Sequence, residues 1–289
     1  MNKNKIAYKE LKAKQKQDLE SGIAGYYIYR HFSTPFTWTF VKFRIPPNII
    51  TIFSFFLCII GFYFLSIGTY ISLIFGLLFF ILFKILDMSD GEVARIQNKT
   101  SIEGIYFDRI SHYLYTCCLG IGLGLGFYRS YKSDTYIVLG FLFMLVFILE
   151  NAINDMLKSV LREGIINKNL NKKKFNKTQM LEKYVLHKLM ERLNKGREWL
   201  KSNILSKLVS IYPFQGLIYS DTFTTPILIV LVIFEYLLSI FISFPFKYNI
   251  IGIVPVYILI VTISKTIWIV WLIYRIEKYR YITTTLNKV

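Results

Sequence analysis

Cysteine is scarce in this 289-residue chain, and its placement excludes two kinds of site. The three cysteines, Cys58, Cys117 and Cys118, all fall inside long apolar stretches, and no metal-ligand spacing links them. In such surroundings a thiol serves as a small apolar side chain. The sequence therefore predicts neither a thiolate metal site nor a redox role for cysteine.

Acidic residues are also few, 18 against 35 lysines and arginines, which gives a formal net charge of +17. No internal repeat and no low-complexity tract divides the chain, so one domain is sufficient. Residues 1–20 are charged and helix-prone, unlike the short apolar core of a cleavable signal peptide. Because none of these features identifies a class of protein, the hydrophobicity of the chain is the main guide to its class.

Apolar sequence is abundant. Hydrophobic residues make up 54% of the chain, and the mean hydropathy is +0.44. Several apolar stretches reach the roughly 20 helical residues that cross a hydrocarbon core of ~30 Å. We therefore predict an all-α polytopic membrane protein with six transmembrane helices plus an N-terminal interfacial amphipathic helix. The six predicted spans are 49–67, 70–86, 104–127, 135–157, 225–243 and 250–274.

Basic residues determine the predicted orientation. Nine lie before residue 49 and fourteen between 158 and 207, whereas the opposite side has only Arg129, Lys132 and Lys247. The positive-inside rule then places both termini, together with the loops at 87–103 and 158–207, on the cytoplasmic face of the cell membrane. Attraction to anionic lipid headgroups explains the charge more simply than a nucleic-acid partner does. We therefore expect membrane lipids, and no nucleic acid, as partners.

These patterns divide the chain into five segments. They are a cytoplasmic or interfacial N-terminal segment (1–48), the first four spans (49–157), a basic cytoplasmic insertion (158–207), the last two spans (208–275) and a cytoplasmic tail (276–289). Residues 25–45, rich in aromatic and basic side chains, form the predicted interfacial segment. Apolar residues recur at helical spacing over 179–201, which predicts a membrane-surface helix or a solvated linker helix.

The most informative motif joins the second span to the third. It comprises Asp87, Asp90, Gly91, Ala94, Arg95, Gly104, Asp108 and His112. Spacings of three and four place each part of the motif on one helix face, and two antiparallel helices can direct both faces into one cavity. Carboxylates at membrane depth are costly and functional by default. Because hard oxygen ligands suit Mg²⁺, Mn²⁺ or Ca²⁺, we predict a divalent-metal site facing a phosphate substrate.

Each member of the motif also has an ordinary explanation when taken alone. Asp87 could be a solvated helix end, Arg95 a topology charge and Gly91 a helix stop. Taken together they suit phosphoryl transfer, which needs metals to neutralise a pyrophosphate and a base to deprotonate a hydroxyl. The small residues Gly91, Ala94 and Gly104 admit a bulky nucleotide, and Arg95 can hold phosphate oxygens.

The run D-x2-D-G-x2-A-R-x8-G-x3-D resembles the motif of the CDP-alcohol phosphotransferase (CDP-alcohol phosphatidyltransferase) family. The segment Pro47-Asn48-Ile49-Ile50-Thr51 is similar to the start of the first span in many members. The resemblance implies a metal-dependent membrane transferase that acts in phospholipid or related lipid-headgroup biosynthesis. Such an enzyme moves a substituted phosphate or phosphonate group from a CDP-alcohol to an acceptor alcohol and releases CMP. The resemblance also implies a homodimer.

The same resemblance implies roles for individual residues. The metal ligands, for one or two ions of Mg²⁺ or Mn²⁺, would be Asp87, Asp90 and Asp108. The nucleotide pocket would be lined by Asn48, Gly91, Ala94, Arg95 and Gly104.

His112 is where the chain departs from the family pattern, which has a further aspartate at this position. Histidine titrates closest to neutral pH of all side chains, so an imidazole is a competent general base. It can also ligate a metal, but it does not supply a fourth negative charge. We predict that His112 is the catalytic base; the alternatives are a pseudoenzyme or a residue that only packs.

The sequence does not identify the alcohol of the donor or the alcohol that accepts the group. The donor is either CDP-diacylglycerol with a soluble acceptor, or a CDP-linked small headgroup transferred to a lipid alcohol. Lys158 and Arg162 are candidates for binding the acceptor or a lipid phosphate, and are equally well explained as positive-inside charges. Asp155 and Glu150 in the fourth span suggest a polar interior face, and so does Lys265 in the sixth span, whose alternative explanation is snorkelling.

Two other classes of function compete with the enzyme. A cation transporter would need acidic groups distributed over several spans, whereas the motif is clustered at one end. A catalytically inactive scaffold could retain nucleotide binding. Metal-dependent release of CMP separates the enzyme from both alternatives.

Overall fold

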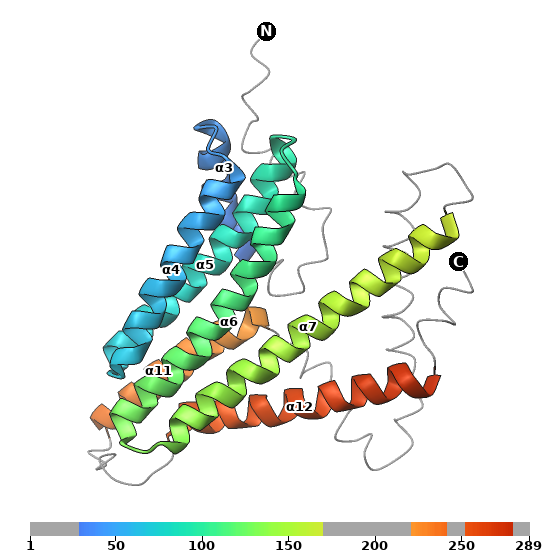
Figure 1. The fold of residues 1–289 in the computed structure, drawn as a ribbon. Helices are drawn as coiled ribbons and strands as arrows, with labels where there is room; N and C mark the ends of the chain where they lie inside the picture. Colours follow the sequence, from blue (N-terminus) through green and yellow to red (C-terminus); the bar gives the residue numbers. More distant parts are fainter. Residues whose placement is uncertain (1–28, 170–220, 242–251, 280–289) are drawn as a thin grey trace. The chain divides into compact units, whose positions relative to one another are not determined.

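The chain is helical in the computed structural model, which describes residues 29–169, 221–241 and 252–279. Within these ranges it has helices and no strand, which confirms the predicted all-α class (Figure 1). The helices are α3 (Arg30–Lys42), α4 (Pro47–Ile67), α5 (Tyr70–Ile96), α6 (Ile102–Tyr131), α7 (Thr135–Asn169), α11 (Asp221–Phe241) and α12 (Ile253–Tyr279).

Five apolar segments of the described helices are long enough to cross a membrane, as expected of a polytopic membrane protein. They are Pro47–Ile67, Tyr70–Ile96, Ile102–Tyr131, Thr135–Ile153 and Ile253–Tyr274. The span predicted at 225–243 corresponds to α11, whose apolar part, Thr224–Leu238, is shorter. The sixth span and the orientation of the chain in the membrane therefore remain predictions.

Local sequence explains where α4, α5 and α6 begin and end. Pro47 starts α4, because its ring fixes φ and its missing N–H would have no partner in a first turn. Gly68 ends α4 with a φ of 85°, a conformation that favours glycine. A capping box at Thr69 then starts α5. The hydroxyl of Ser101 accepts a hydrogen bond from the backbone N–H of Gly104 at 3.0 Å and caps α6.

The described helices belong to two compact units. The first unit runs to Leu145 and resumes over Leu217–Val261, so it contains the whole acidic motif. Within it, α4 packs along both α5 and α6. The approach of α6 to the end of α4 is close, because a methyl group added at Gly126 would overlap the carbonyl oxygen of Leu65. Glycine at this position permits the contact.

A buried carboxylate, Glu235, links four helices of the first unit. It accepts hydrogen bonds from the Tyr131 hydroxyl of α6 at 2.8 Å and from the backbone N–H of Val254 in α12 at 3.1 Å. The Tyr70 hydroxyl of α5 makes a longer contact at 3.5 Å. Because Glu235 is only 1% exposed, these donors replace the water that a buried carboxylate lacks. The contacts hold α11 against α5 and α6.

The second unit comprises Val146–Gly216 and Thr262–Val289. Within it, Lys265 of α12 forms an ion pair with Glu150 of α7, and its Nζ lies 4.0 Å from the centroid of the Phe147 ring. Lys265 is 5% exposed. The polar interior face expected from these two residues is thus a buried ion pair with an aromatic neighbour.

Some predicted elements lie outside the described residues. The helix expected over 179–201 and the tail at 280–289 are among them. Only the later part of the predicted segment 25–45 is described, and it contains α3. Its location at a membrane interface remains a prediction.

Candidate active site

The acidic motif begins on the final part of α5. Asp87 and Asp90 are three residues apart and share one side of this helix, and Lys84 precedes Asp87 by the same interval. The helix continues through Gly91 to Ile96, so this glycine is not a helix stop. The loop that follows leads to α6, which carries the rest of the motif.

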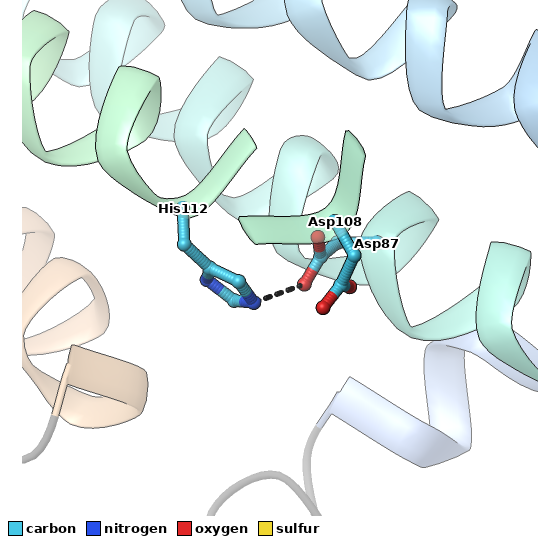
Figure 2. A group of neighbouring side chains, drawn as sticks. All are labelled: Asp87, Asp108 and His112. Carbon is cyan, nitrogen blue, oxygen red and sulfur yellow. Dashed lines mark ion pairs between the residues drawn. The ribbon is translucent and has the colours of Figure 1, made fainter. Parts of the chain in front are cut away.

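Asp87, Asp108 and His112 converge from the two helices (Figure 2). One ligand atom from each lies within 4.8 Å of the others. His112 Nε2 is 3.5 Å from Asp87 Oδ2, and the Asp87 side chain is 9% exposed against 39% for His112. Two carboxylates and an imidazole at this separation fit a divalent ion such as Mg²⁺ or Mn²⁺.

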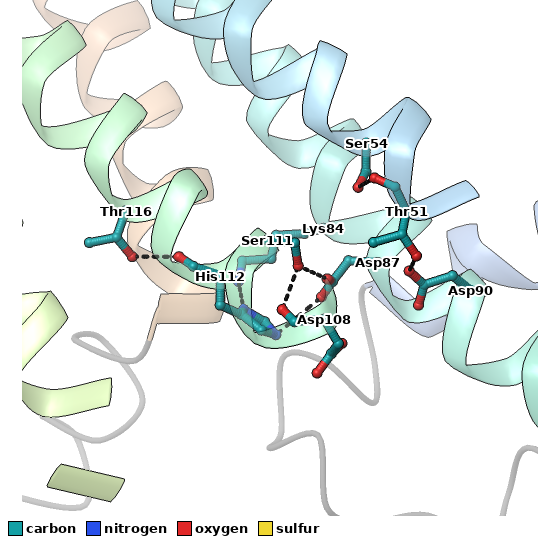
Figure 3. Close-up of polar contacts among 9 residues, drawn as sticks. All are labelled: Thr51, Ser54, Lys84, Asp87, Asp90, Asp108, Ser111, His112 and Thr116. Atoms are coloured by element: carbon teal, nitrogen blue, oxygen red, sulfur yellow. Dashed lines mark hydrogen bonds and ion pairs between the residues drawn. The ribbon is translucent and has the colours of Figure 1, made fainter. Parts of the chain in front are cut away.

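Ser111 restricts the orientation of Asp87. Its hydroxyl lies 3.2 Å from Asp87 Oδ1 and 2.6 Å from the backbone carbonyl oxygen of Asp108, so it can donate to either acceptor (Figure 3). Asp87 therefore has Ser111 beside one carboxylate oxygen and His112 beside the other. Contacts of this kind orient ligands before a metal binds.

Asp90 lies outside the converging group. Its Oδ2 accepts a hydrogen bond of 2.6 Å from Thr51 Oγ1 of α4, and the residue is 5% exposed (Figure 3). Thr51 closes the segment that resembles the start of the family's first span, and the structure supplies a physical role for its hydroxyl. Metal binding by Asp90 stays a prediction.

Replacing Thr51 with Val should destabilise the first unit. Valine keeps the shape of threonine but leaves the buried Asp90 carboxylate with one hydrogen bond fewer. We expect the free energy of unfolding to fall by about 1–3 kcal/mol, measured by denaturant titration of the purified protein in detergent. Thr51→Ser keeps the hydroxyl and should remain near wild type. An equal loss in both variants would assign the effect to packing.

Lys84 is a site residue that the motif did not indicate. Its Nζ lies 3.4 Å from His112 Nδ1 (Figure 3). The same atom lies 4.2 Å from the centroid of the Tyr115 ring, and the residue is 6% exposed. The signal for it was present in the sequence. An ionisable residue inside an apolar run is costly, and this one precedes Asp87 by a single helical turn.

The residues predicted to line the nucleotide pocket lie near the ends of α4, α5 and α6. A Cβ atom added to Gly104 would lie 3.9 Å from Asn48 Oδ1, and one added to Gly91 would lie 3.5 Å from Arg95 Nη1. Asn48 and Arg95 are exposed, and Ala94 is half-buried. The structure thus brings Asn48 beside Gly104 and Arg95 beside Gly91. Nucleotide binding by these residues is still a prediction.

Helix α3 supports α5 from the side opposite to the acidic residues. Thr37 donates a hydrogen bond of 2.7 Å to Glu92 Oε2, and Ser89 lies 3.4 Å from the carbonyl oxygen of Ser33. All four residues are buried, whereas Phe32 of α3 is 55% exposed. The Thr37 hydroxyl and the Ser33 carbonyl of α3 therefore face α5 and help to fix the helix that carries Asp87.

Lys158 and Arg162 both lie on α7, in the second unit. Their side chains are outside those that the structure describes. The role proposed for them in acceptor binding is thus a prediction from the sequence alone.

An all-helical membrane protein with this convergent acidic motif matches a known family. The family model described as CDP-alcohol phosphatidyltransferase matches residues 44–193, more than half of the chain and the region that holds every predicted site residue. The chain belongs to the CDP-alcohol phosphatidyltransferase family.

One relative, an uncharacterized protein of Aquifex aeolicus (strain VF5), is 32% identical over 118 residues. The aligned region is 39% of this chain and 56% of the relative. The chain thus spans about half the length of the curated relative that it matches.

Proposed function

We propose that the protein is an integral-membrane transferase that moves a substituted phosphate or phosphonate group from a CDP-alcohol to an acceptor alcohol. CMP is the leaving group. The observation that carries this proposal is the convergence of Asp87, Asp108 and His112 within 4.8 Å, inside the region that matches the family. Three such groups, at the end of one apolar helix and in the first part of the next, need a function that outweighs the cost of placing them there.

The donor set supports a divalent-metal cofactor, Mg²⁺ or Mn²⁺. Asp87, Asp90 and Asp108 would hold one or two ions; Asp87 and Asp108 lie in the converging group, and Asp90 is on the same side of α5 as Asp87. When bound, such an ion neutralises the developing negative charge of a pyrophosphate. Ser111 keeps Asp87 oriented for this role.

His112 is the proposed general base. The acceptor hydroxyl oxygen attacks the phosphorus atom that bears the donor's alcohol or headgroup. A new P–O bond forms while the bond from that phosphorus to the bridging oxygen breaks, and CMP leaves. The hydroxyl proton passes to the imidazole of His112, whose side chain is 39% exposed and so accessible to a substrate.

The nucleotide pocket of the proposal lies beside this centre. Arg95 can donate two parallel hydrogen bonds to phosphate oxygens. Gly91 and Gly104 carry no side chain where the diphosphate would approach, and the exposed Asn48 lies next to Gly104. Ala94 adds a further small residue on the same helix as Gly91.

The substrates and setting of the reaction follow from the same proposal. The reaction belongs to phospholipid or related lipid-headgroup biosynthesis, with the active site and both termini in the cytoplasm and the chain in the cell membrane. Either CDP-diacylglycerol donates to a soluble alcohol, or a CDP-linked headgroup is transferred to a lipid alcohol. Lys158 and Arg162 would bind the acceptor or a lipid phosphate. A homodimer is the expected assembly.

A panel of CDP-alcohols tests the proposal. The purified full chain is incubated in lipid nanodiscs with CDP-diacylglycerol and soluble alcohols, or with CDP-linked amino alcohols and polyols and a lipid alcohol. CMP is measured by chromatography with and without Mg²⁺ or Mn²⁺. We expect metal-dependent CMP release for at least one donor and acceptor pair. Saturable CDP-alcohol binding without release would identify an inactive nucleotide-binding scaffold, and a cation transporter would show neither.

A further inference from the structure

The acidic motif contains a cation of its own. Lys84 occupies the same side of α5 as Asp87, and its ammonium group lies near the imidazole of His112 (Figure 3). The same ammonium group also lies over the Tyr115 ring. An aromatic face attracts a cation. Because the residue is 6% exposed, solvent screens its charge only weakly. The structure therefore holds a positive charge beside His112, which converges with two of the predicted metal ligands.

The charge of Lys84 is balanced by the motif as a whole. In the part of the chain that the structure describes, no carboxylate lies within ion-pair distance of its Nζ. Its charge acts through space on the carboxylates of the motif, Asp108 among them. Arg109 attracts the same carboxylate, but it is only partly buried and is therefore screened more strongly.

We propose that Lys84 supplies one of the positive charges that the acidic motif requires, so that the motif binds a single divalent ion. This inference rests on the proposed function, which gives the motif its divalent ion. When all three are ionised, as metal-binding carboxylates are, Asp87, Asp90 and Asp108 carry three negative charges, and Lys84 neutralises one of them. The two that remain match one divalent ion. The imidazole of His112 adds no negative charge, so a second ion would enter a site with no net charge left to attract it.

The geometry agrees with this charge balance. The carboxylates of Asp87 and Asp108 lie, with His112, in one group of mutually close atoms, and the two carboxylates there are enough to hold one ion. Asp90, the third carboxylate, is engaged by Thr51 through a hydrogen bond of 2.6 Å. Lys84 lies beside residue 112, which is a histidine in this chain and an aspartate in the family pattern.

Binding of Mn²⁺ alone tests the inference without any substrate. The full chain in nanodiscs is dialysed against Mn²⁺, and bound metal per chain is counted above that of Asp87→Asn, which lacks a ligand. Electron paramagnetic resonance then distinguishes an isolated ion from a spin-coupled pair, which two ions about 3.5–4 Å apart would form. We expect one isolated ion per wild-type chain. Two ions, a coupled pair or no site-specific ion would overturn the proposal.

Variants of Lys84 separate charge from packing. Lys84→Met should tighten Mn²⁺ binding by about tenfold or more, because it removes a repelling charge from a weakly screened site. Lys84→Arg keeps the charge and should bind one ion with nearly wild-type affinity. The double variant Lys84→Met/His112→Asp should bind two ions as a coupled pair. Lys99→Met removes an exposed cation from the loop after α5 and is the matched control, with no expected change.

These measurements stand apart from the transferase assay. Unchanged Mn²⁺ affinity in a folded Lys84→Met protein, equal to that of Lys99→Met, would contradict the role of Lys84. Size-exclusion profiles and melting temperatures identify folded variants, and the wild-type stoichiometry tests the proposal even if a variant fails to fold. One ion per chain together with no CMP release would refute the proposed activity and leave the charge inference supported.

Discussion

Asp87→Asn should abolish metal binding and CMP release together. Asp87 is the most central carboxylate of the site, because Ser111 approaches one of its oxygens and His112 the other. Asparagine keeps the shape but removes the charge. A divalent ion contributes several kcal/mol of charge stabilisation, so kcat/KM should fall by on the order of 10³-fold or more. Equilibrium dialysis with Mn²⁺ and the CMP assay measure the two losses in the same preparation.

Glu92→Gln is the matched control for this variant. Glu92 is also a buried carboxylate of α5, but it lies on the opposite side of the helix and accepts a hydrogen bond from Thr37. An amide oxygen can still accept that bond. We therefore expect nearly wild-type Mn²⁺ affinity and turnover. Comparable losses in both variants would mean that disturbance of α5 caused them, and full turnover in Asp87→Asn would exclude the cluster as the catalytic centre.

The helices themselves were largely predictable, because apolar runs and helix breakers are local signals. Pro47 and Gly68 bound α4 close to the predicted span 49–67. The second span shows the limit of this approach. Its apolar run ends at residue 86, whereas α5 continues to Ile96. Hydropathy indicates which part of a helix is apolar enough for lipid. A helix can continue through polar residues, so hydropathy does not locate its end.

The convergence of Asp87, Asp108 and His112 agrees with the spacing, which also directed Asp90 into the same cavity, where the structure leaves it outside the converging group. Residues one turn apart share a helix face, and two adjacent antiparallel helices can direct their faces toward each other. The contacts between Thr51 and Asp90 were not predictable in the same way. They depend on how α4 and α5 are rotated about their own axes, which local sequence does not specify.

Buried charged groups away from the motif were the hardest to anticipate. Glu235 lies inside the predicted span 225–243, and its hydrogen-bond partners come from three other helices. Its burial is explained only once those donors are brought together in space. Lys265 was noticeable in the sequence as a charge inside a span, but its ion pair with Glu150 depends on the packing of α12 against α7 in the second unit.

His112→Ala should reduce CMP release by about 10²–10⁴-fold, the usual contribution of a general base. If His112 is the base, the two carboxylates Asp87 and Asp108 still hold the ion, so Mn²⁺ affinity should change much less than turnover. If His112 is instead a metal ligand, Mn²⁺ affinity and turnover should fall together. Nearly normal turnover in a folded variant would refute both roles and leave a residue that only packs against Lys84 and Asp87.

His112→Asp completes this test, because it restores the aspartate of the family pattern. A carboxylate can accept a proton and also adds a negative charge to the motif. We expect turnover to recover well above that of His112→Ala, and Mn²⁺ affinity to rise above that of wild type. Recovery with tighter metal binding would show that histidine and aspartate perform the same step at this position, with Lys84 adjusting the charge that the site presents to its ion. Failure to recover would mean that the chemistry of this protein has come to depend on an imidazole at this position.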